Sequence, residues 1–330
     1  MKFGLLLPHF GEYASRERLL VGARLAEELG FDSVWVRDHL VFEPHSEMED
    51  PNSVFYEALT TLTAVGAVTE RITLGTGSLI PFRHPIHLAL SLASMSQLLG
   101  DRLIAGFGAG TFDHEFEAVG LGGIFRPELL ESNVRILRRL FSENNVDYED
   151  AHYKLDKITV EPKPVGEIPI WYCGATPASA RRAVEYCDGW MPGRITLATI
   201  AKRVESMTQQ ASERGVNVPV VGVIPPTSIA KTHEEAFDGL NIDGLVKWAN
   251  ERGKWWVKPQ SGVFETAEDI QGSLIAGTPE EVVAEVVRFQ DVGVEHLVFD
   301  LRLRFDRWFD SIELLGNQVL PELRAKGVAG

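Results

Sequence analysis

The sequence predicts an α/β fold, a (β/α)8 or TIM barrel with insertions at the carboxyl-terminal face of the sheet. Short apolar runs alternate with longer amphipathic segments along the chain, which is the pattern of repeated strand–helix units. The run 33–36 is almost continuously apolar, as in parallel strands that are buried on both faces. Neither a tandem repeat nor a hinge-like linker divides the 330 residues, so we expect one barrel domain over 1–330.

Eight strands and eight helices are expected in alternation. The strands are predicted at 3–7, 33–36, 72–79, 103–109, 168–173, 189–191, 218–224 and 296–300. The helices are predicted at 16–29, 55–69, 86–99, 127–141, 178–186, 197–214, 281–292 and 309–326. Capping signals support several boundaries: Ser15 and Gly30 enclose the first helix, Thr176 precedes the fifth, and a capping box from Thr278 to Glu281 begins the seventh.

Two insertions interrupt the alternation. Residues 142–168 are polar and broken by prolines, which predicts a short β-excursion. Residues 225–276 are the longest departure and carry large aromatic residues, among them Trp248, Trp255, Trp256 and Phe264. Such aromatics form either a small core of their own or a wall of the substrate site. A long polar loop at 40–53 follows the second strand, and long loops at the catalytic face are often functional.

The composition excludes several classes of protein. Forty-seven acidic residues against 32 basic ones give a net charge of -15, the wrong sign for binding nucleic acid or an anionic membrane surface. Two cysteines, Cys173 and Cys187, predict neither a disulfide framework nor a zinc site, and we expect no bound metal. With no secretion signal and no apolar run of roughly 18 residues, the protein is expected in the cytoplasm.

Asp38 and His39 are the candidate catalytic residues. They follow the strand at 33–36, and barrel enzymes place their chemistry at the carboxyl ends of their strands. An imidazole, whose ordinary pKa is about 6.5, is suited to moving a proton near neutral pH. The alternative is that Asp38 caps the next segment and His39 is a hydrogen-bonded loop residue.

Two small-residue loops are candidates for binding a phosphate. Gly106 to Gly110 resembles a dinucleotide fingerprint, but the spacing after the second glycine is wrong for one. Gly174, Ala175 and Thr176 lead into a helix whose first amide groups would face an anion. A tight strand–helix turn that merely requires small residues explains the second loop equally well.

Helix 55–69 is apolar around much of its circumference. A helix of this kind buries more than one face, so we expect it to lie in a subunit interface together with helix 86–99. The sequence thus predicts a homodimer.

Five motifs in chain order carry a family resemblance. They are Gly30-Phe31-Asp32-Ser33-Val34-Trp35 with Asp38-His39, Leu74-Gly75-Thr76-Gly77 with Arg83-His84-Pro85, Gly108-Ala109-Gly110 with Glu115-Phe116, Ile170-Trp171 with Gly174 and Asp188-Gly189-Trp190, and Gly277-Thr278-Pro279-Glu280-Glu281. Over nearly its whole length the chain resembles the luciferase-like monooxygenase superfamily, and within it the branch that uses the deazaflavin coenzyme F420 rather than FMN.

The resemblance implies which residues hold the cofactor. It places Asp38 and His39 beside the reactive ring, and a non-proline cis peptide at Gly77-Ser78 in a bulge that supports this ring. It assigns the rest of the cofactor site to the loops after the fourth and fifth strands, at Gly108, Ala109, Gly110, Cys173, Gly174, Ala175 and Thr176. The chain departs from some relatives at 110–112, so no catalytic acid is carried over there, and Glu115 is expected in a structural salt bridge.

Three functions are compatible with these residues. The first is an F420-dependent oxidoreductase that moves a hydride between the deazaflavin and a small organic substrate, with His39 handling the proton. The second is an FMN-dependent monooxygenase that receives reduced flavin from a separate reductase. The third is a non-catalytic protein that binds flavin or deazaflavin. Asp-His rather than Glu-His at 38–39 favours the first.

Overall fold

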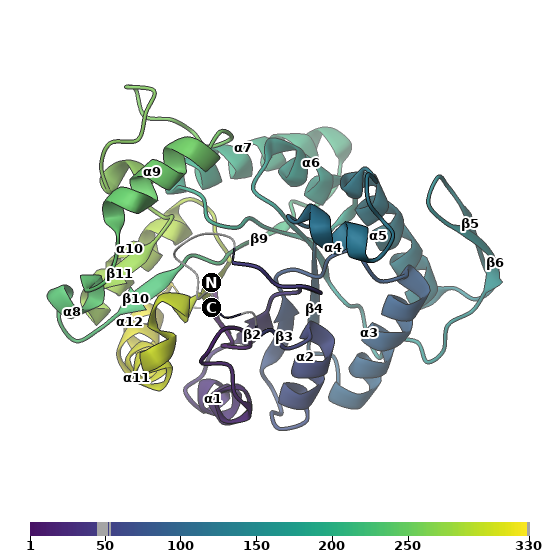
Figure 1. Cartoon of the computed structure of the whole chain (residues 1–330), viewed down its shortest axis with the longest axis horizontal. Helices are drawn as coiled ribbons and strands as arrows, with labels where there is room; N and C mark the ends of the chain where they lie inside the picture. Colours follow the sequence, from purple (N-terminus) through teal and green to yellow (C-terminus); the bar gives the residue numbers. More distant parts are fainter. Residues whose placement is uncertain (45–51, 53, 329–330) are drawn as a thin grey trace.

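A closed barrel of eight parallel strands lies at the centre of the protein, in a computed structural model that describes residues 1–44, 52 and 54–328 (Figure 1). Its strand order is β1-β12-β9-β8-β7-β4-β3-β2, and every neighbouring pair is parallel. The barrel strands are β1 (Lys2–Leu6), β2 (Ser33–Val36), β3 (Thr73–Thr76), β4 (Leu103–Gly108), β7 (Ile170–Cys173), β8 (Gly189–Met191), β9 (Val220–Val223) and β12 (His296–Phe299). The predicted barrel is confirmed, with most strands shorter than predicted by one to four residues.

Helices surround the barrel (Figure 1). They are α1 (Arg16–Glu28), α2 (Ala58–Gly66), α3 (Pro85–Leu99), α4 (Asp113–Ala118), α5 (Arg126–Ser142), α6 (Pro177–Tyr186), α7 (Leu197–Arg214), α10 (Pro279–Asp291), α11 (Trp308–Leu314) and α12 (Leu320–Ala325). Three of the predicted caps are observed, with Ser15, Thr176 and Thr278 each accepting a hydrogen bond from an amide of the first turn. The short helix α4 was not predicted, and the π-helical turn η3 (Leu315–Val319) separates α11 from α12.

Tryptophan side chains fill the barrel interior where neighbouring strands carry glycine. The ring centres of Trp35 and Trp171 lie 5.5 Å apart, and the ring of His296 meets both indoles edge-on. A Cβ atom on Gly75 would come within 2.4 Å of the Trp35 ring, and one on Gly189 within 2.5 Å of Trp171. The glycines in these strands are therefore explained by the close approach of an indole.

The two insertions start from opposite ends of the barrel. Residues 142–168 precede β7 and form the hairpin β5 (Val146–Glu149) and β6 (Lys154–Ile158), the predicted β-excursion, at the right of Figure 1. Although this connection enters from the amino-terminal end of the barrel, Tyr153 near the hairpin tip reaches His84 at the carboxyl-terminal end, with ring centres 5.2 Å apart.

The longer insertion follows β9 and therefore begins at the carboxyl-terminal face. It contains a small parallel sheet and three short helical segments, β10 (Thr227–Ile229), α8 (His233–Phe237), α9 (Ile242–Arg252), η1 (Glu268–Ile270) and β11 (Ile275–Gly277). Trp256 and Phe264 are buried against each other, while Trp248 packs on Trp256 with its ring centre 5.7 Å away. Trp256 and Phe264 are therefore core residues, but their core is continuous with that of the barrel and is not a separate one.

The described part of the chain contains no helix that is both long and apolar enough to span a lipid bilayer. Most of the loop predicted at 40–53 lies outside the described residues, which include 40–44 and 52 of this loop. In α2, Leu59, Leu62 and Val65 are buried within the subunit, so intramolecular packing already accounts for most of the apolar surface that led us to expect an interface.

Candidate active site

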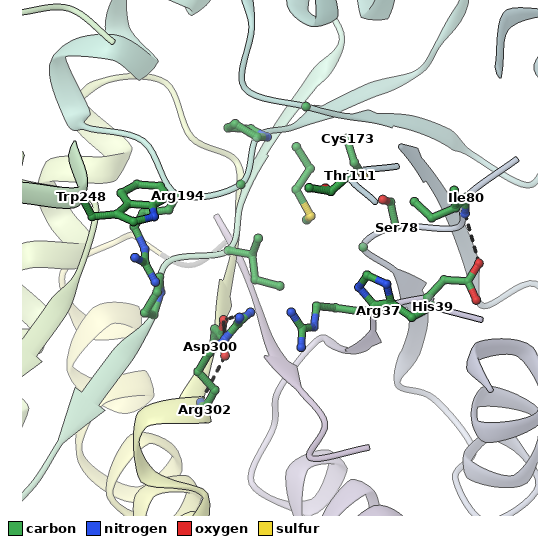
Figure 2. A pocket seen from close by; sticks show the side chains of 18 residues that line it. Arg37, His39, Ser78, Ile80, Thr111, Cys173, Arg194, Trp248, Asp300 and Arg302 are labelled. Atoms are coloured by element: carbon green, nitrogen blue, oxygen red, sulfur yellow. Dashed lines mark hydrogen bonds and ion pairs between the residues drawn. The ribbon is translucent and has the colours of Figure 1, made fainter. Parts of the chain in front are cut away.

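A cavity of about 320 Å³ opens at the carboxyl ends of the barrel strands (Figure 2). Six of the residues predicted for the site line it together, namely Asp38, His39, Gly77, Ser78, Cys173 and Gly174. The other five, Gly108, Ala109, Gly110, Ala175 and Thr176, lie beside it in the loops that leave β4 and β7. The structure thus brings into one place residues that are separated by as many as 138 positions in the chain, as between Asp38 and Thr176.

At the floor of the cavity, the pairing between β3 and β4 is interrupted. The peptide bond between Gly77 and Ser78 is cis, as the family resemblance implied. The hydroxyl of Thr76 bridges the interruption, since it accepts a hydrogen bond from the amide of Gly106 (2.9 Å) and donates one to the carbonyl of Gly106 (3.0 Å). A Cβ on Gly108 would lie 2.3 Å from the Ser78 hydroxyl oxygen. Glycine at 108 therefore allows Ser78 to face the cavity.

Asp38 is held by cationic and amide donors. Both of its carboxylate oxygens accept hydrogen bonds from Arg83 (2.5 and 2.9 Å), and the amide of Ile80 donates a third at 3.1 Å. Burial opposes the charge of Arg83, but Asp38 and Glu57 outweigh burial and raise the arginine's pKa. Asp38 therefore connects the end of β2 with the start of α3. This arrangement suits a positioning role and not proton transfer.

His39 and Glu115 form a buried pair. His39 Nδ1 lies 3.1 and 3.2 Å from the two oxygens of Glu115, and the amides of Leu40 and Val41 donate to the same carboxylate. Burial raises the pKa of Glu115, but these hydrogen bonds and the imidazole outweigh burial and lower it. Since a carboxylate only accepts hydrogen bonds, Nδ1 carries the proton that Glu115 accepts, and the imidazole also lines the cavity. The predicted pairing of Glu115 is observed as a hydrogen bond with His39, the candidate catalytic residue, and it becomes a salt bridge when the imidazole is protonated.

Three phenylalanines enclose the imidazole of His39. The ring centres of Phe42, Phe55 and Phe112 lie 5.3, 5.2 and 5.6 Å from it, and the His39 side chain is only 7% exposed. Rings packed this closely exclude water from most of the imidazole, which strengthens its hydrogen bond to Glu115. His39 is thus a largely buried residue in the wall of the cavity.

The loops after β4 and β7 form a cradle suited to a phosphate. Gly108 pairs with Cys173 in register, so both loops start side by side. Thr176 caps α6 by accepting from the amide of Ser179, while the amides of Ala175 and Ala178 have no acceptor among the described residues. Free amides at a helix N-terminus are ready to donate to an anion.

Cys173 lines the cavity as a neutral thiol. Burial raises its pKa to about 12, and a hydrogen bond with Ser78 only partly opposes this shift. A thiol with this pKa is not a nucleophile at neutral pH. The cysteine is therefore a small apolar part of the wall, consistent with its predicted place in a cofactor site.

Sequence reasoning missed a second set of lining residues. Arg37, Thr111, Met191, Arg194, Trp248, Asp300 and Arg302 also face the cavity (Figure 2). Four of them are charged residues that stand at or just beyond the carboxyl ends of β2, β8 and β12. The rule that singled out Asp38 and His39 would have found these four if it had been applied to every strand. Trp248 comes from the insertion and carries no such signal, but it lines the cavity.

Comparisons with known proteins cover nearly the whole chain. Residues 1–296 match the family model described as luciferase-like monooxygenase. A relative in Intrasporangium calvum, named F420-dependent glucose-6-phosphate dehydrogenase, is 35% identical and aligned over 91% of this chain and 92% of its own.

Two solved structures share the fold. One is an F420-dependent secondary alcohol dehydrogenase in complex with an F420–acetone adduct, with a TM-score of 0.78, 21% identity and coverage of 97% of this chain and 98% of that one. The other is the oxygenating constituent of 3,6-diketocamphane monooxygenase from Pseudomonas putida in complex with FMN, with a TM-score of 0.78, 18% identity and the same coverage of both chains.

Proposed function

Since this chain belongs to the luciferase-like monooxygenase family, we propose that it is an F420-dependent oxidoreductase that transfers a hydride between the deazaflavin and a small organic alcohol or carbonyl compound. The observation that carries the proposal is the His39–Glu115 pair, which stands in the wall of a cavity next to the loops suited to a phosphate. The relatives named for F420 support the choice of cofactor.

The residues present fit the cofactor. Gly77 and Ser78 would lie beneath its ring, the amides of Ala175 and Ala178 would donate to its phosphate, and Gly108 to Gly110 would line the opposite side of the phosphate cradle. When bound, F420 supplies the hydride chemistry. The protein supplies orientation, a water-poor cavity and control of one proton.

His39 handles this proton at Nε2. During oxidation of an alcohol, Nε2 takes the hydroxyl proton, and during reduction of a carbonyl compound it returns one. Glu115 stabilises the imidazolium that forms, because its carboxylate lies against Nδ1. Asp38 is assigned a positioning role, because Arg83 and the amide of Ile80 occupy its oxygens.

Equilibrium binding of oxidised F420, reduced F420 and FMN tests the cofactor assignment. F420 should bind at least about tenfold more tightly than FMN, a difference of about 1.4 kcal/mol. The reverse preference would support an FMN-dependent monooxygenase with a separate reductase, the alternative to which the Pseudomonas putida structure points. F420 that binds tightly but never exchanges a hydride would support the non-catalytic alternative.

The homodimer is proposed with α2 and α3 at its interface. Most apolar residues of α2 are already buried, but Leu90 and Leu98 of α3 are 42% and 76% exposed. Leu98→Lys should shift the protein from dimer to monomer in sedimentation at micromolar concentration while the fold persists, because a cation would be buried in an apolar contact. A monomeric wild type would contradict the proposal.

A further inference from the structure

One side of the cavity is apolar, and part of it comes from the insertion after β9. Met191, Ile224, Pro226 and Trp248 form this side, here called the apolar wall. We propose that the apolar wall binds a hydrocarbon group of the substrate and that Trp248 is the residue that determines this specificity. The inference rests on the proposed function, because the same substrate carries the hydroxyl or carbonyl group that reacts.

The four residues of the apolar wall come from neighbouring strands and one helix. Met191 ends β8, and Ile224 and Pro226 follow β9, which pairs with β8. Trp248 is a half-buried residue of α9 that faces the same cavity. Among the lining residues that the structure describes, Trp248 is the only one with a phenyl, phenol or indole ring. Its flat face is therefore the largest apolar surface that a ligand can cover there.

The apolar wall stands opposite the loop that is proposed to support the cofactor ring. In the closed strand order, β9 and β3 are four strands apart in either direction, and Gly77 and Ser78 follow β3. Figure 2 shows Trp248 across the cavity from Ser78 and Cys173. A substrate that lies between these two sides turns its non-reacting part to the apolar wall.

The charged residues beside the apolar wall are already engaged within the protein. Asp300 is fully buried and accepts hydrogen bonds from Nε (2.6 Å) and Nη2 (2.5 Å) of Arg302. The guanidinium carbon of Arg194 lies 4.9 Å from the ring centre of Trp248 itself. A polar ligand group would have to compete with such pairs, whereas a hydrocarbon group gains free energy by leaving water. The wall thus favours an apolar ligand group over a hydroxylated one.

Trp248 is held in place by a small aromatic stack. Its ring centre lies 5.7 Å from that of Trp256, which lies 5.7 Å from that of Phe264, and both of these partners are buried. Asn250 fixes α9 to the same segment, since its side chain donates to the carbonyl of Phe264 (2.8 Å) and accepts from its amide (3.0 Å). A surface that is rigid before binding loses little conformational entropy when a ligand covers it.

A purely structural role for Trp248 makes a different prediction. If the indole only packs on Trp256, its replacement lowers the stability of the fold and affects every ligand alike. If it contacts the substrate, replacement weakens the binding of apolar ligands and spares polar ones. Two alcohols with the same carbon ring therefore separate the two roles.

The experiment titrates the F420-loaded protein by calorimetry with cyclohexanol and, separately, with myo-inositol, which carries a hydroxyl on every carbon of the same ring. The wild type should bind cyclohexanol at least about tenfold more tightly than myo-inositol. Trp248→Ala should weaken cyclohexanol binding by about tenfold and change myo-inositol binding by less than about twofold. Trp248→Phe keeps an aromatic face and should retain most of the affinity for cyclohexanol.

Trp255→Ala is the matched control. Trp255 belongs to the same insertion, is 49% exposed and lies outside the cavity lining, so its replacement should leave both affinities unchanged. Should Trp248→Ala fail to fold, Ile224→Thr takes its place, because it shortens a side chain of the apolar wall and adds a hydroxyl. It should weaken the binding of cyclohexanol severalfold and spare myo-inositol.

Three results would overturn the inference. The first is a wild type that does not bind cyclohexanol, or binds it no more tightly than myo-inositol. The second is native cyclohexanol affinity in Trp248→Ala of native far-ultraviolet circular dichroism. The third is an equal loss of affinity for both alcohols in that variant, which is the structural outcome.

The proposed function can fail separately, because these titrations require no turnover. If F420 itself does not bind, the same titrations are made on the protein without cofactor. A preference for cyclohexanol that Trp248→Ala abolishes then supports the apolar wall, although the hydride-transfer proposal has failed. Equal affinity of the wild type for the two alcohols refutes the apolar wall.

Discussion

The two halves of the cavity mouth use different chemistry. The loops after β3, β4 and β7, here the glycine half, present small residues and backbone amides, as at Gly77, Gly108 and Ala175. The loops after β2, β8 and β12, here the charged half, present side chains such as Arg37 and His39. The glycine half can be tested only by substitutions that add a side chain, because its residues have few side-chain atoms to remove. The charged half can be tested by substitutions that remove a functional group from a side chain.

The largest effect is expected in the charged half. His39→Asn should keep the fold and roughly the F420 affinity while lowering the rate of hydride transfer by about 10²- to 10⁴-fold, the usual contribution of a positioned acid or base. Single-turnover reduction or oxidation of bound F420 is the measurement, because product release can mask the chemical step.

His87→Asn, an exposed histidine of α3, is the matched control and should react at the native rate. A native single-turnover rate in His39→Asn would remove the proton-handling role. It would also leave the charged half with a binding task only.

The next effect is expected in the glycine half. Ala175→Glu should weaken F420 binding by at least about 100-fold without unfolding the barrel, since its carboxylate would compete with the phosphate for the amides at the start of α6. Ala175→Gln has the same bulk without the charge and should bind F420 more tightly than the Glu variant. Fluorescence titration with F420 measures both affinities, and unchanged affinity in a folded Glu variant would exclude this loop from the site.

A smaller effect is expected at Glu115, which orients His39 of the charged half. Glu115→Gln should lower kcat by roughly 10- to 100-fold with little change in KM, because partners that orient an imidazole typically contribute this much. Glu117→Gln, an exposed neighbour on the same helix, is the control. Comparable loss in both variants would contradict the positioning role.

Glu115 also predicts a pH dependence of stability. Its pKa is lower in the folded protein than its ordinary value, so the carboxylate stabilises the fold above the unfolded pKa of about 4.3, and this stabilisation is lost as the pH falls through the folded value. The wild type should therefore exceed Glu115→Gln in free energy of unfolding by about 1–3 kcal/mol at pH 7. Urea unfolding between pH 3 and pH 7 should show this difference shrinking on the acid side.

The contrast between the halves also explains what could be predicted. The barrel followed from alternation of apolar runs, and α7 and β8 have the predicted bounds because a cap or a glycine marks their ends. In the glycine half, the small residues after two strands drew attention to the loops at Gly108 and Gly174, whereas Gly77, Ser78 and Cys173 came only from the family resemblance. Residues 142–168 were correctly predicted to contain a β-excursion for the same local reason.

The charged half was predicted only in part, because its contacts are distant in sequence. Arg37 and Arg302 belong to opposite ends of the chain, and only closure of the barrel through β1 brings them together. Glu115 was expected in a salt bridge, but His39 as its partner could not be known without the packing of α4. Much of the apolar circumference of α2 is buried within the subunit, as at Leu59 and Val65, so the proposed homodimer rests mainly on the exposed Leu90 and Leu98 of α3.

The tryptophans beneath the cavity limit how this protein can evolve. Trp35 is accommodated only because Gly75 lacks a side chain, and Trp171 has the same relation to Gly189 and to Gly222, where a Cβ would also come within 2.5 Å. A lineage that enlarges one of these glycines must first reduce the indole opposite it, because a Cβ at these distances cannot coexist with the ring. The barrel floor is therefore expected to change as coupled pairs, while the mouth loops diverge one residue at a time and acquire new substrates.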